Sequence, residues 1–374
     1  MPLRSIVFWY NAPTIHQFGL IRALAEDPAS RVTMAAFHNL LPDRREMGWS
    51  EPDFGRATRT IVRTDAERDR LIAAHAEPDA LHVFSGIRGF AGVYGAFRRA
   101  ALTRARLGVM AIRPDARRGS GLPRYLAHAL QAIRFRRRID IVFASGRIGV
   151  DWYQRVGFHA SRVFEFGNFG DMPDASPSGN EPGGPYRLLY VGALVERKGV
   201  DVLLRALATV PSSSWQLEVM GDGPSKEALI ELAGRLGIQR SIQWTGFQER
   251  ARVYDALARA DTALLPSRHD GWGSVINEAL MSGTRVVCSD ACGAAVLVEA
   301  SGHGQIVPAG RADALRDAIR ASIERGRQSA EDRAAIRRWA ARVTPQRGAE
   351  YFRSIVLHVA RQAARPVPPW RAEG

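Results

Sequence analysis

The chain has 374 residues, 46% hydrophobic and 24% charged, as is typical of a globular protein large enough for two domains, and its formal net charge is +14. Its two cysteines, Cys288 and Cys292, are too few for a disulfide framework or a structural zinc site. No apolar run reaches the roughly 18 residues of a membrane span, and the N-terminus lacks a signal-peptide pattern, so we expect a cytoplasmic protein.

The first half of the chain alternates short β-type runs with helical patterns. Strands are expected at residues 5–9, 32–37, 81–84, 108–112, 139–144 and 162–166, and helices at residues 14–26, 66–76 and 122–138. Apolar strands that alternate with helices are typical of a parallel sheet covered on both faces. We therefore predict an α/β, Rossmann-like domain over residues 1–169.

Arginines are concentrated between residues 98 and 138, where Asp115 is the only acid. A basic region of this kind could bind anionic lipid, nucleic acid or a phosphorylated substrate. A solvated arginine-rich face explains the same pattern equally well, because charge runs are weak signals on their own.

A second domain follows a stretch dense in Pro, Gly and Ser at residues 170–186, which we interpret as a linker. Beyond it, strands are expected within residues 186–194, 215–223, 242–247, 261–267, 284–290 and 304–308. This alternation predicts a second Rossmann-like domain over residues 187–344, facing the first across a cleft. A last helix at about 345–374, apolar at Tyr351, Phe352 and Ile355, is expected to cross back to the first domain.

Polar residues and glycines follow the first two strands of the second half, where open α/β sheets bind ligands. Gly192 ends one strand, and the cations Arg197 and Lys198 come before the next helix. Two cations beside a helix start can bind phosphate, although loop cations usually face water. The next strand ends in Gly221-Asp222-Gly223, which lets a ligand approach the backbone and which, taken alone, is also an ordinary turn.

Two carboxylates eight residues apart, Asp270 and Glu278, flank the start of a short helix. Between them, Gly271-Trp272-Gly273 forms a loop, and Ser274 is the expected N-cap of a helix over residues 275–281. Backbone N–H groups at this start favour an anion such as a diphosphate. Asp270 could accept hydrogen bonds from sugar hydroxyls, and Glu278 could bind a diol such as a ribose.

In combination, the ordered motifs GALVERKGVDVLL, VMGDGP, WTGF and LLPSRHDGWGSVINEALMSGTRVVCSD resemble the donor-binding domain of the retaining GT-B glycosyltransferases of family 4, the glycosyl transferases group 1. The resemblance covers residues 185–310 closely and the first 170 residues only in layout. It implies a GT-B fold and transfer, with retention, from a nucleoside-diphosphate sugar to a hydroxyl acceptor. The acceptor would be a lipid-linked or other glycan of polysaccharide or glycoconjugate biosynthesis.

Residue roles follow from the resemblance. Lys198, with Arg197 beside it, would hold the donor diphosphate and stabilise the leaving group. Glu278 would bind the ribose. Asp270 would contact the sugar, although the family usually has Glu at that position. The remaining donor contacts would be Gly192, Gly221, Asp222, Gly223, Gly271, Trp272, Gly273 and Ser274, and the acceptor side would include Asn11, His16, Gly86 and Arg88. We expect no cofactor and no metal, because the chain lacks the Asp-x-Asp pair of metal-dependent transferases.

Other classes of protein explain parts of the pattern. An NAD-dependent dehydrogenase would need a G-x-G-x-x-G after the first strand of either half, and none is present. A nucleic-acid partner is not expected, because aromatic residues do not interleave with the basic run. A sugar-nucleotide epimerase of the same build, with His16, His82 or His303 as acid or base, stays open, as does a transferase with a soluble small-molecule acceptor. The basic run also leaves open a peripheral contact with the anionic inner face of the cytoplasmic membrane.

Overall fold

The computed structural model describes residues 3–13, 16–41, 51–114, 121–174, 184–361 and 363–372. The chain divides into two compact units, Met1–Asp171 with Val343–Gly374, and Met172–Arg342. Most of the predicted linker, the first two residues of the predicted helix 14–26, and Asp115, Arg117 and Arg118 of the basic run lie outside the described residues.

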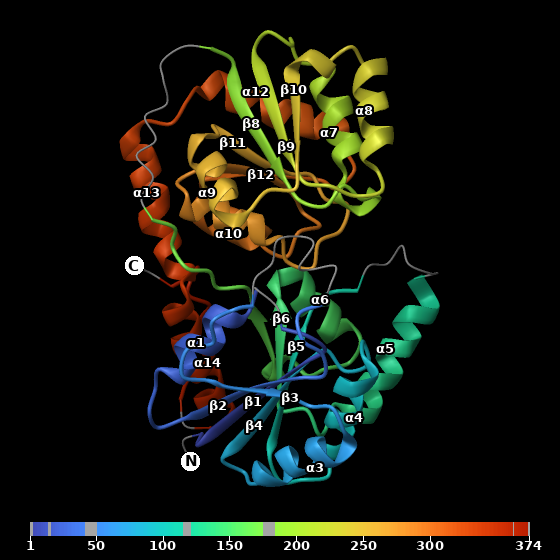
Figure 1. Ribbon diagram of the computed structural model, residues 1–374, viewed down its shortest axis with the longest axis vertical. Helices are drawn as coiled ribbons and strands as arrows, with labels where there is room; N and C mark the ends of the chain where they lie inside the picture. The colour runs from blue at the N-terminus through green and yellow to red at the C-terminus, as the bar shows by residue number, and fades with distance from the viewer. Residues whose placement is uncertain are drawn as a thin grey trace. The chain divides into compact units, whose positions relative to one another are not determined.

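The described part of the first unit contains a seven-stranded parallel sheet in the order β3-β2-β1-β4-β5-β6-β7 (Figure 1). Its strands are β1 (Ser5–Tyr10), β2 (Arg31–Ala36), β3 (Thr58–Ile61), β4 (Ala80–Ser85), β5 (Arg106–Ala111), β6 (Ile141–Ser145) and β7 (Val163–Phe166). Its helices are α1 (Phe18–Ala25), α3 (Asp65–Ala74), α4 (Ala91–Ala100), α5 (Gly121–Phe135), α6 (Gly146–Arg155), the short η1 (Ala160–Arg162) and α14 (Pro345–Val359).

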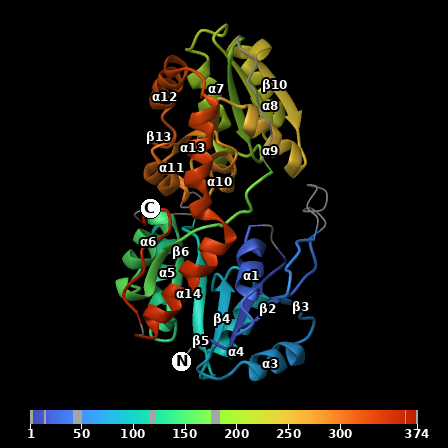
Figure 2. The ribbon, with the colours of Figure 1, turned by 90° about the vertical axis from the view of Figure 1, so that its left-hand side faces the viewer.

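The two faces of the first sheet are covered by different helices. Residues of α3, α4, α5 and α6 form one core with alternate strand positions such as Val7 and Trp9. On the other face α14 lies beside α1 (Figure 2) and inserts Phe352, whose ring stacks on Phe143 at 4.8 Å and lies 5.9 Å from Phe8. The predicted return of the C-terminal helix to the first domain is therefore observed.

The return helix is shorter than predicted. It ends at Val359 rather than extending over residues 345–374. Prolines at 366, 368 and 369 lack the backbone N–H that a helix interior requires, so the tail cannot continue as a helix. The tail is nevertheless anchored, because Trp370 is buried and its ring lies 6.2 Å from that of Phe169.

The described part of the second unit contains a six-stranded parallel sheet in the order β10-β9-β8-β11-β12-β13. Its strands are β8 (Tyr186–Val191), β9 (Trp215–Met220), β10 (Ile242–Gly246), β11 (Thr262–Leu265), β12 (Arg285–Ser289) and β13 (Gly304–Val307). Its helices are α7 (Val200–Leu207), α8 (Lys226–Arg235), α9 (Arg250–Arg259), α10 (Ser274–Met281), α11 (Ala295–Ser301), α12 (Ala312–Arg325) and α13 (Ala330–Ala340), with the short η2 (Glu196–Lys198), η3 (Gln239–Ser241) and η4 (Ala341–Val343).

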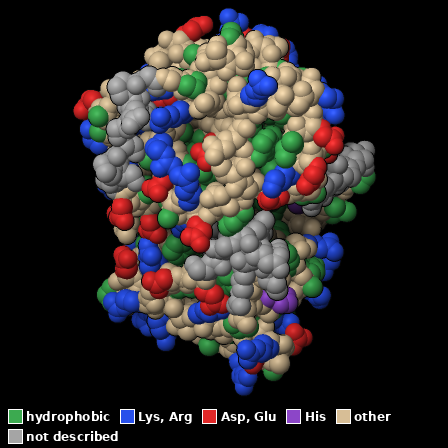
Figure 3. Space-filling model, turned by 45° about the horizontal axis from the view of Figure 1, so that its top comes forward, with side chains coloured by type: hydrophobic (Ala, Val, Ile, Leu, Met, Phe, Trp, Pro, Cys, Tyr) green, Lys and Arg blue, Asp and Glu red, His purple; other side chains and the backbone are tan. Residues whose placement is uncertain are grey.

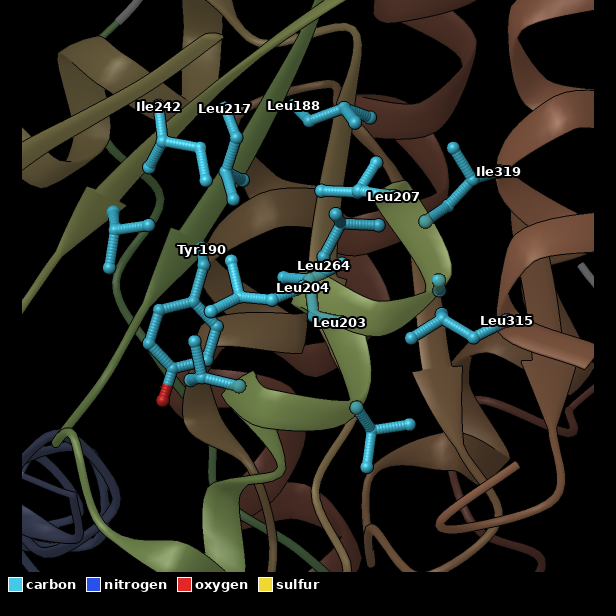
Figure 4. Packing of buried hydrophobic residues seen from close by; sticks show 14 of the residues in the cluster. Leu188, Tyr190, Leu203, Leu204, Leu207, Leu217, Ile242, Leu264, Leu315 and Ile319 are labelled. Atoms are coloured by element: carbon cyan, nitrogen blue, oxygen red, sulfur yellow. The ribbon is translucent and has the colours of Figure 1, made fainter. Parts of the chain in front are cut away.

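The core of the second unit lies between its sheet and the helices α7, α8 and α12. Figure 4 shows Leu203, Leu204 and Leu207 of α7 packed against strand residues and against Ile319 of α12. Tyr190 of β8 belongs to the same core, and its hydroxyl donates to the backbone oxygen of Ala193 at 3.0 Å. This packing fixes the end of β8, where the candidate site begins.

Candidate functional site

The candidate donor site lies at the carboxyl edge of the second sheet, between β8 and β11. From β8 the strand order runs outward through β9 on one side, and β11 begins the other side. Ligands of open α/β sheets bind at such switch points, because the loops after the two central strands diverge there. The loop after β8 carries Arg197 and Lys198, and the loop after β11 carries Asp270.

Lys198 and Asp270 form an ion pair across this switch point. The Lys198 Nζ lies 2.5 Å from Asp270 Oδ2, and only 13% and 12% of the two side chains are exposed. A pair with so little solvent exposure is weakly screened and holds both groups in place. The sequence predicted both residues for the site, but not that they contact each other.

A second ion pair ties the two loops together. The guanidinium of Arg268 donates to both carboxylate oxygens of Asp201 at 2.5 Å and to the backbone oxygen of Glu196 at 3.0 Å. The backbone N–H of Arg268 donates to the carbonyl of Arg197 at 2.8 Å, and the Arg197 guanidinium contacts the carbonyl of His269 at 3.5 Å. The pairing of Arg268 with Asp201 was missed, since nothing in the sequence links residues 67 positions apart.

Glycines allow the loops of this edge to approach closely. Gly199 has a φ of +69°, and a Cβ there would lie 2.2 Å from the backbone oxygen of Pro266. A Cβ on Gly221 would lie 1.9 Å from the backbone oxygen of Gly192. Since real atoms cannot approach so closely, any other residue at these positions would push the turns after β8, β9 and β11 apart.

The turn after β9 carries a surface ion pair. Asp222 accepts from the Lys226 Nζ at 2.7 Å and from the N–H of Gly223 at 2.8 Å. The lysine, followed by this N–H, holds the pKa of the exposed Asp222 carboxyl below its usual value of 3.8. Asp222 is thus ionised at neutral pH, and part of its hydrogen-bonding capacity is used within its own turn.

The start of α10 differs from the prediction in one respect. Ser274 is the first residue of the helix rather than its N-cap, and Gly273 occupies the N-cap position with a φ of +93°. A Cβ on Gly273 would lie 2.7 Å from the side chain of Leu265. The turn therefore requires glycine immediately before the helix, and the predicted capping role of Ser274 was wrong.

Trp272 anchors the loop that precedes α10. Its side chain is buried, and its indole N–H donates to the Asn277 Oδ1 at 2.7 Å. Its carbonyl accepts from the N–H of Ala294 at 2.8 Å, and Gly293 packs against Gly271. The indole is thus used inside the fold, and the contribution that Gly271-Trp272-Gly273 can make to a ligand is through the backbone.

Glu278 lies one turn into α10 and is half-buried. Within the described ranges of the chain, its carboxylate has no hydrogen-bond or ion-pair partner. Burial raises the pKa of this carboxyl above its usual value of 4.5, and the positive charge of Arg250 opposes that rise. An unsatisfied, partly desolvated acceptor beside a helix start is suited to hydroxyl donors from a ligand.

The candidate acceptor residues lie at the corresponding edge of the first sheet. Asn11 follows β1, and Gly86 and Arg88 follow β4, which is the neighbour of β1 in the sheet. The Asn11 carbonyl accepts from the N–H of His38 at 2.9 Å, and the exposed Arg88 guanidinium lies 5.4 Å from the ring centre of Tyr94. His16 is exposed between β1 and α1.

Two of the histidines considered for epimerase chemistry lie away from either edge. His82 is fully buried in β4, where its Nδ1 accepts from the Trp9 indole N–H at 3.0 Å and its Nε2 contacts the His75 carbonyl at 2.9 Å. Burial lowers the pKa of His82 to about 4. His303 directly precedes β13, at the amino end of that strand. These placements leave the two side chains no access to a ligand at the carboxyl edges.

Comparison with known proteins finds a family model that matches the second unit. Residues 171–341 match the family model of the glycosyl transferases group 1. An alpha-D-kanosaminyltransferase of Streptomyces kanamyceticus is 31% identical over 134 residues, which are 35% of this chain and 35% of that protein. The lipopolysaccharide core biosynthesis glycosyltransferase LpsE of Rhizobium meliloti (strain 1021) is 32% identical over 132 residues, which are 35% of this chain and 38% of that protein.

A solved structure extends the likeness to nearly the whole chain. The alignments with the two curated relatives span little more than a third of each relative's length. The crystal structure of Anabaena HepE in complex with UDP covers 95% of this chain and 100% of its own, with a TM-score of 0.75 and 16% identity. At that identity the match establishes the fold, which is GT-B, built from two Rossmann-like domains. Over residues 171–341 this chain thus resembles the glycosyl transferases group 1.

Proposed function

We propose that this protein is a retaining, metal-independent glycosyltransferase that moves a sugar from a nucleoside-diphosphate sugar to a hydroxyl acceptor. The observation that carries the proposal is the pairing of Lys198 with Asp270 at the switch point of the second sheet. The pair joins a cation suited to a diphosphate and an acid suited to sugar hydroxyls. HepE binds UDP with a fold of the same kind, which supports a nucleotide at this edge.

The cationic side of the site would stabilise the leaving group. A nucleoside diphosphate that departs from an anomeric carbon gains negative charge, which fixed positive groups stabilise as it develops. Lys198 provides an ammonium, Arg197 lies beside it, and backbone N–H groups at the start of α10 add their dipole. These groups would replace the divalent ion that other transferases use for the same purpose.

The two acids would divide the donor between them. Asp270 contacts Lys198 in the structure, so an arriving diphosphate would share that ammonium with the carboxylate. The second oxygen of Asp270 would then accept a hydrogen bond from a sugar hydroxyl. Glu278, with no partner in the described residues, would bind the ribose diol.

The acceptor would bind on the first domain, near Asn11, His16, Gly86 and Arg88. Front-face attack by the acceptor hydroxyl, with its proton passing to the leaving phosphate, would give retention. We favour a lipid-linked or other glycan made at the cytoplasmic face of a membrane, with a soluble small molecule as the alternative acceptor.

A donor screen tests the proposal. Purified protein is incubated with UDP-, GDP- and ADP-sugars, and the released nucleoside diphosphate is measured with and without excess EDTA. We expect release from one nucleotide class, equal in the two conditions. Loss of release in EDTA with recovery on adding Mg²⁺ would contradict the metal-independent mechanism, and an interconverted sugar nucleotide without release would indicate an epimerase.

A further inference from the structure

Helix α5 carries an apolar stripe that faces solvent. Leu126, Leu130 and Ile133 are 50%, 65% and 63% exposed. The three residues are spaced at i, i+4 and i+7, so they share one face of the helix. Isolated exposed leucines are common, but a continuous stripe along one helix indicates an interaction surface.

The opposite face of α5 is packed against its own unit. Ala132 is buried, and the ring of Phe135 meets that of Phe97 in α4 at 5.0 Å. The rings of Tyr125 and His128 both lie edge-on to Trp152, at 6.2 and 5.7 Å. Figure 1 shows α5 beside α4 in the first unit. The helix is thus fixed in place by one face and presents the other outward.

The loop after α4 carries a further exposed apolar side chain. Leu102 is 78% exposed, which is the highest value among the large exposed apolar side chains of the described residues. Arg138, just beyond α5, holds this loop by donating to the carbonyls of Ala101 at 3.0 Å, Thr103 at 2.9 Å and Ala105 at 2.7 Å. The loop and the end of α5 therefore form one surface, which we call the α5 surface.

Exposed arginines lie at the C-terminal end of α5 and in the loop after α4. Arg104, Arg134, Arg136 and Arg137 are exposed, and none of them forms an ion pair within the described ranges. Over the described part of residues 100–139 the chain has no acid. By contrast, Asp and Glu side chains lie among the Lys and Arg side chains on the face of the molecule in Figure 3. The α5 surface is therefore locally both apolar and positively charged.

We propose that the α5 surface docks on an anionic lipid bilayer, with Leu126, Leu130 and Ile133 entering the headgroup boundary and the arginines contacting lipid phosphates. An amphipathic helix with basic flanks binds membranes in this way, through apolar area and attraction to anionic lipid together. No helix within the described ranges is long and apolar enough to cross a membrane, so the contact is peripheral. The inference deepens the proposed function, which places the favoured acceptor at a membrane, because it names the surface that would contact that membrane.

The test uses vesicles and does not depend on the transfer reaction. The full chain is sedimented with vesicles of phosphatidylcholine alone or mixed with phosphatidylglycerol. We expect the wild type to bind the mixed vesicles. Two double variants, Leu130→Glu with Ile133→Glu and Arg134→Glu with Arg137→Glu, should each lower this binding at least about tenfold. For the arginine variant the reason is that each basic residue near an anionic surface raises binding by a factor of roughly five. The matched controls Ile230→Glu and Arg240→Glu, exposed on the second unit, should bind like the wild type.

Three results would overturn the inference. The first is failure of the wild type to bind the mixed vesicles, and the second is undiminished binding by the α5 variants. The third is a lower oligomer mass of the α5 variants in light scattering without any change in their vesicle binding, which would assign the surface to contact with a second copy of the chain. Nucleoside-diphosphate affinity and thermal unfolding, measured on the same variants, verify the fold. A chain that binds vesicles but turns over no sugar nucleotide would leave the inference standing and refute the proposed function.

Discussion

The carboxyl edges of the two sheets share the same strand topology but differ in how closely their turns are packed. In the second unit, a Cβ on Gly199 or Gly221 would lie 2.2 or 1.9 Å from a backbone oxygen of a neighbouring turn. In the first unit, Gly86 also has a positive φ, of +84°, but a Cβ there would meet no described atom within 4 Å. Close packing dictates the residue type at one edge and leaves it open at the other.

Charge follows the same division. In the second unit, Lys198 and Arg268 are held by Asp270 and Asp201 at 2.5 Å, whereas Arg88 in the first unit is exposed and stacks on a tyrosine. Side chains held rigidly by ion pairs are suited to binding a constant part of a ligand, and exposed side chains are suited to binding a part that varies between ligands. We interpret the contrast as support for the proposal of a fixed nucleotide site on the second unit and an adaptable acceptor site on the first.

The largest expected effect comes from breaking the charge pair. Lys198→Ala should lower the rate of nucleotide release by about 100- to 1,000-fold, the usual effect of removing a group that stabilises developing negative charge. The control is Lys226→Ala, which removes the chain's other lysine, a surface partner of Asp222, and should have a far smaller effect. A turnover in Lys198→Ala close to that of the wild type would refute the assignment of the diphosphate site.

The glycine contrast predicts unequal losses of stability. Gly221→Ala should lower the free energy of unfolding by more than about 3 kcal/mol, since backbone must move to admit the methyl group. Gly86→Ala, strained only by its φ, should cost about 1–2 kcal/mol. Urea denaturation followed by tryptophan fluorescence measures both, and equal losses would remove the distinction between the edges.

Substitutions of Glu278 and Asp270 should affect the affinity for different ligands. Glu278→Gln should weaken nucleoside-diphosphate binding about ten- to hundredfold, as expected for a lost charged hydrogen bond. Asp270→Asn should leave that affinity unchanged or raise it, because Lys198 loses its competing carboxylate, and should weaken binding of the sugar nucleotide. Calorimetry with both ligands distinguishes these outcomes. Wild-type binding by both variants would mean that neither carboxylate contacts the donor.

The smallest effect concerns pH. Because the pKa of Glu278 in the folded protein is raised, the folded state holds this proton more tightly than the unfolded state does. Wild-type stability should therefore fall relative to Glu278→Gln as the pH rises from about 4.5 through the folded-state pKa, and the difference should then level off. Thermal unfolding of the two proteins across this range measures it. A wild-type stability that rises relative to that of Glu278→Gln over this pH range would contradict the burial of this carboxyl.

Several elements escaped prediction for identifiable reasons. Helices α4 and α6 contain glycines that lower intrinsic helix propensity, yet Val93, Phe97 and Tyr153 bury their apolar faces on the sheet. Strand β3 lies at the sheet edge with its residues largely exposed, so it lacks the apolar pattern that marks the central strands. In these three elements packing and edge pairing, rather than local sequence, decide the structure.

The sequence by itself determined the alternation of strands and helices, the two Rossmann-like domains and the return of the last helix, because apolar periodicity and chain order are local properties. It also marked the glycines and charges at the carboxyl edge of the second sheet, since close backbone approach restricts which residues can stand there. Only the tertiary structure decided that Lys198 contacts Asp270 and that Arg268 pairs with Asp201. The same holds for the burial of His82 and the exposure of the apolar stripe of α5. Such relations join residues that are distant in the chain, or depend on what covers a face, and these follow from the packing of strands and helices.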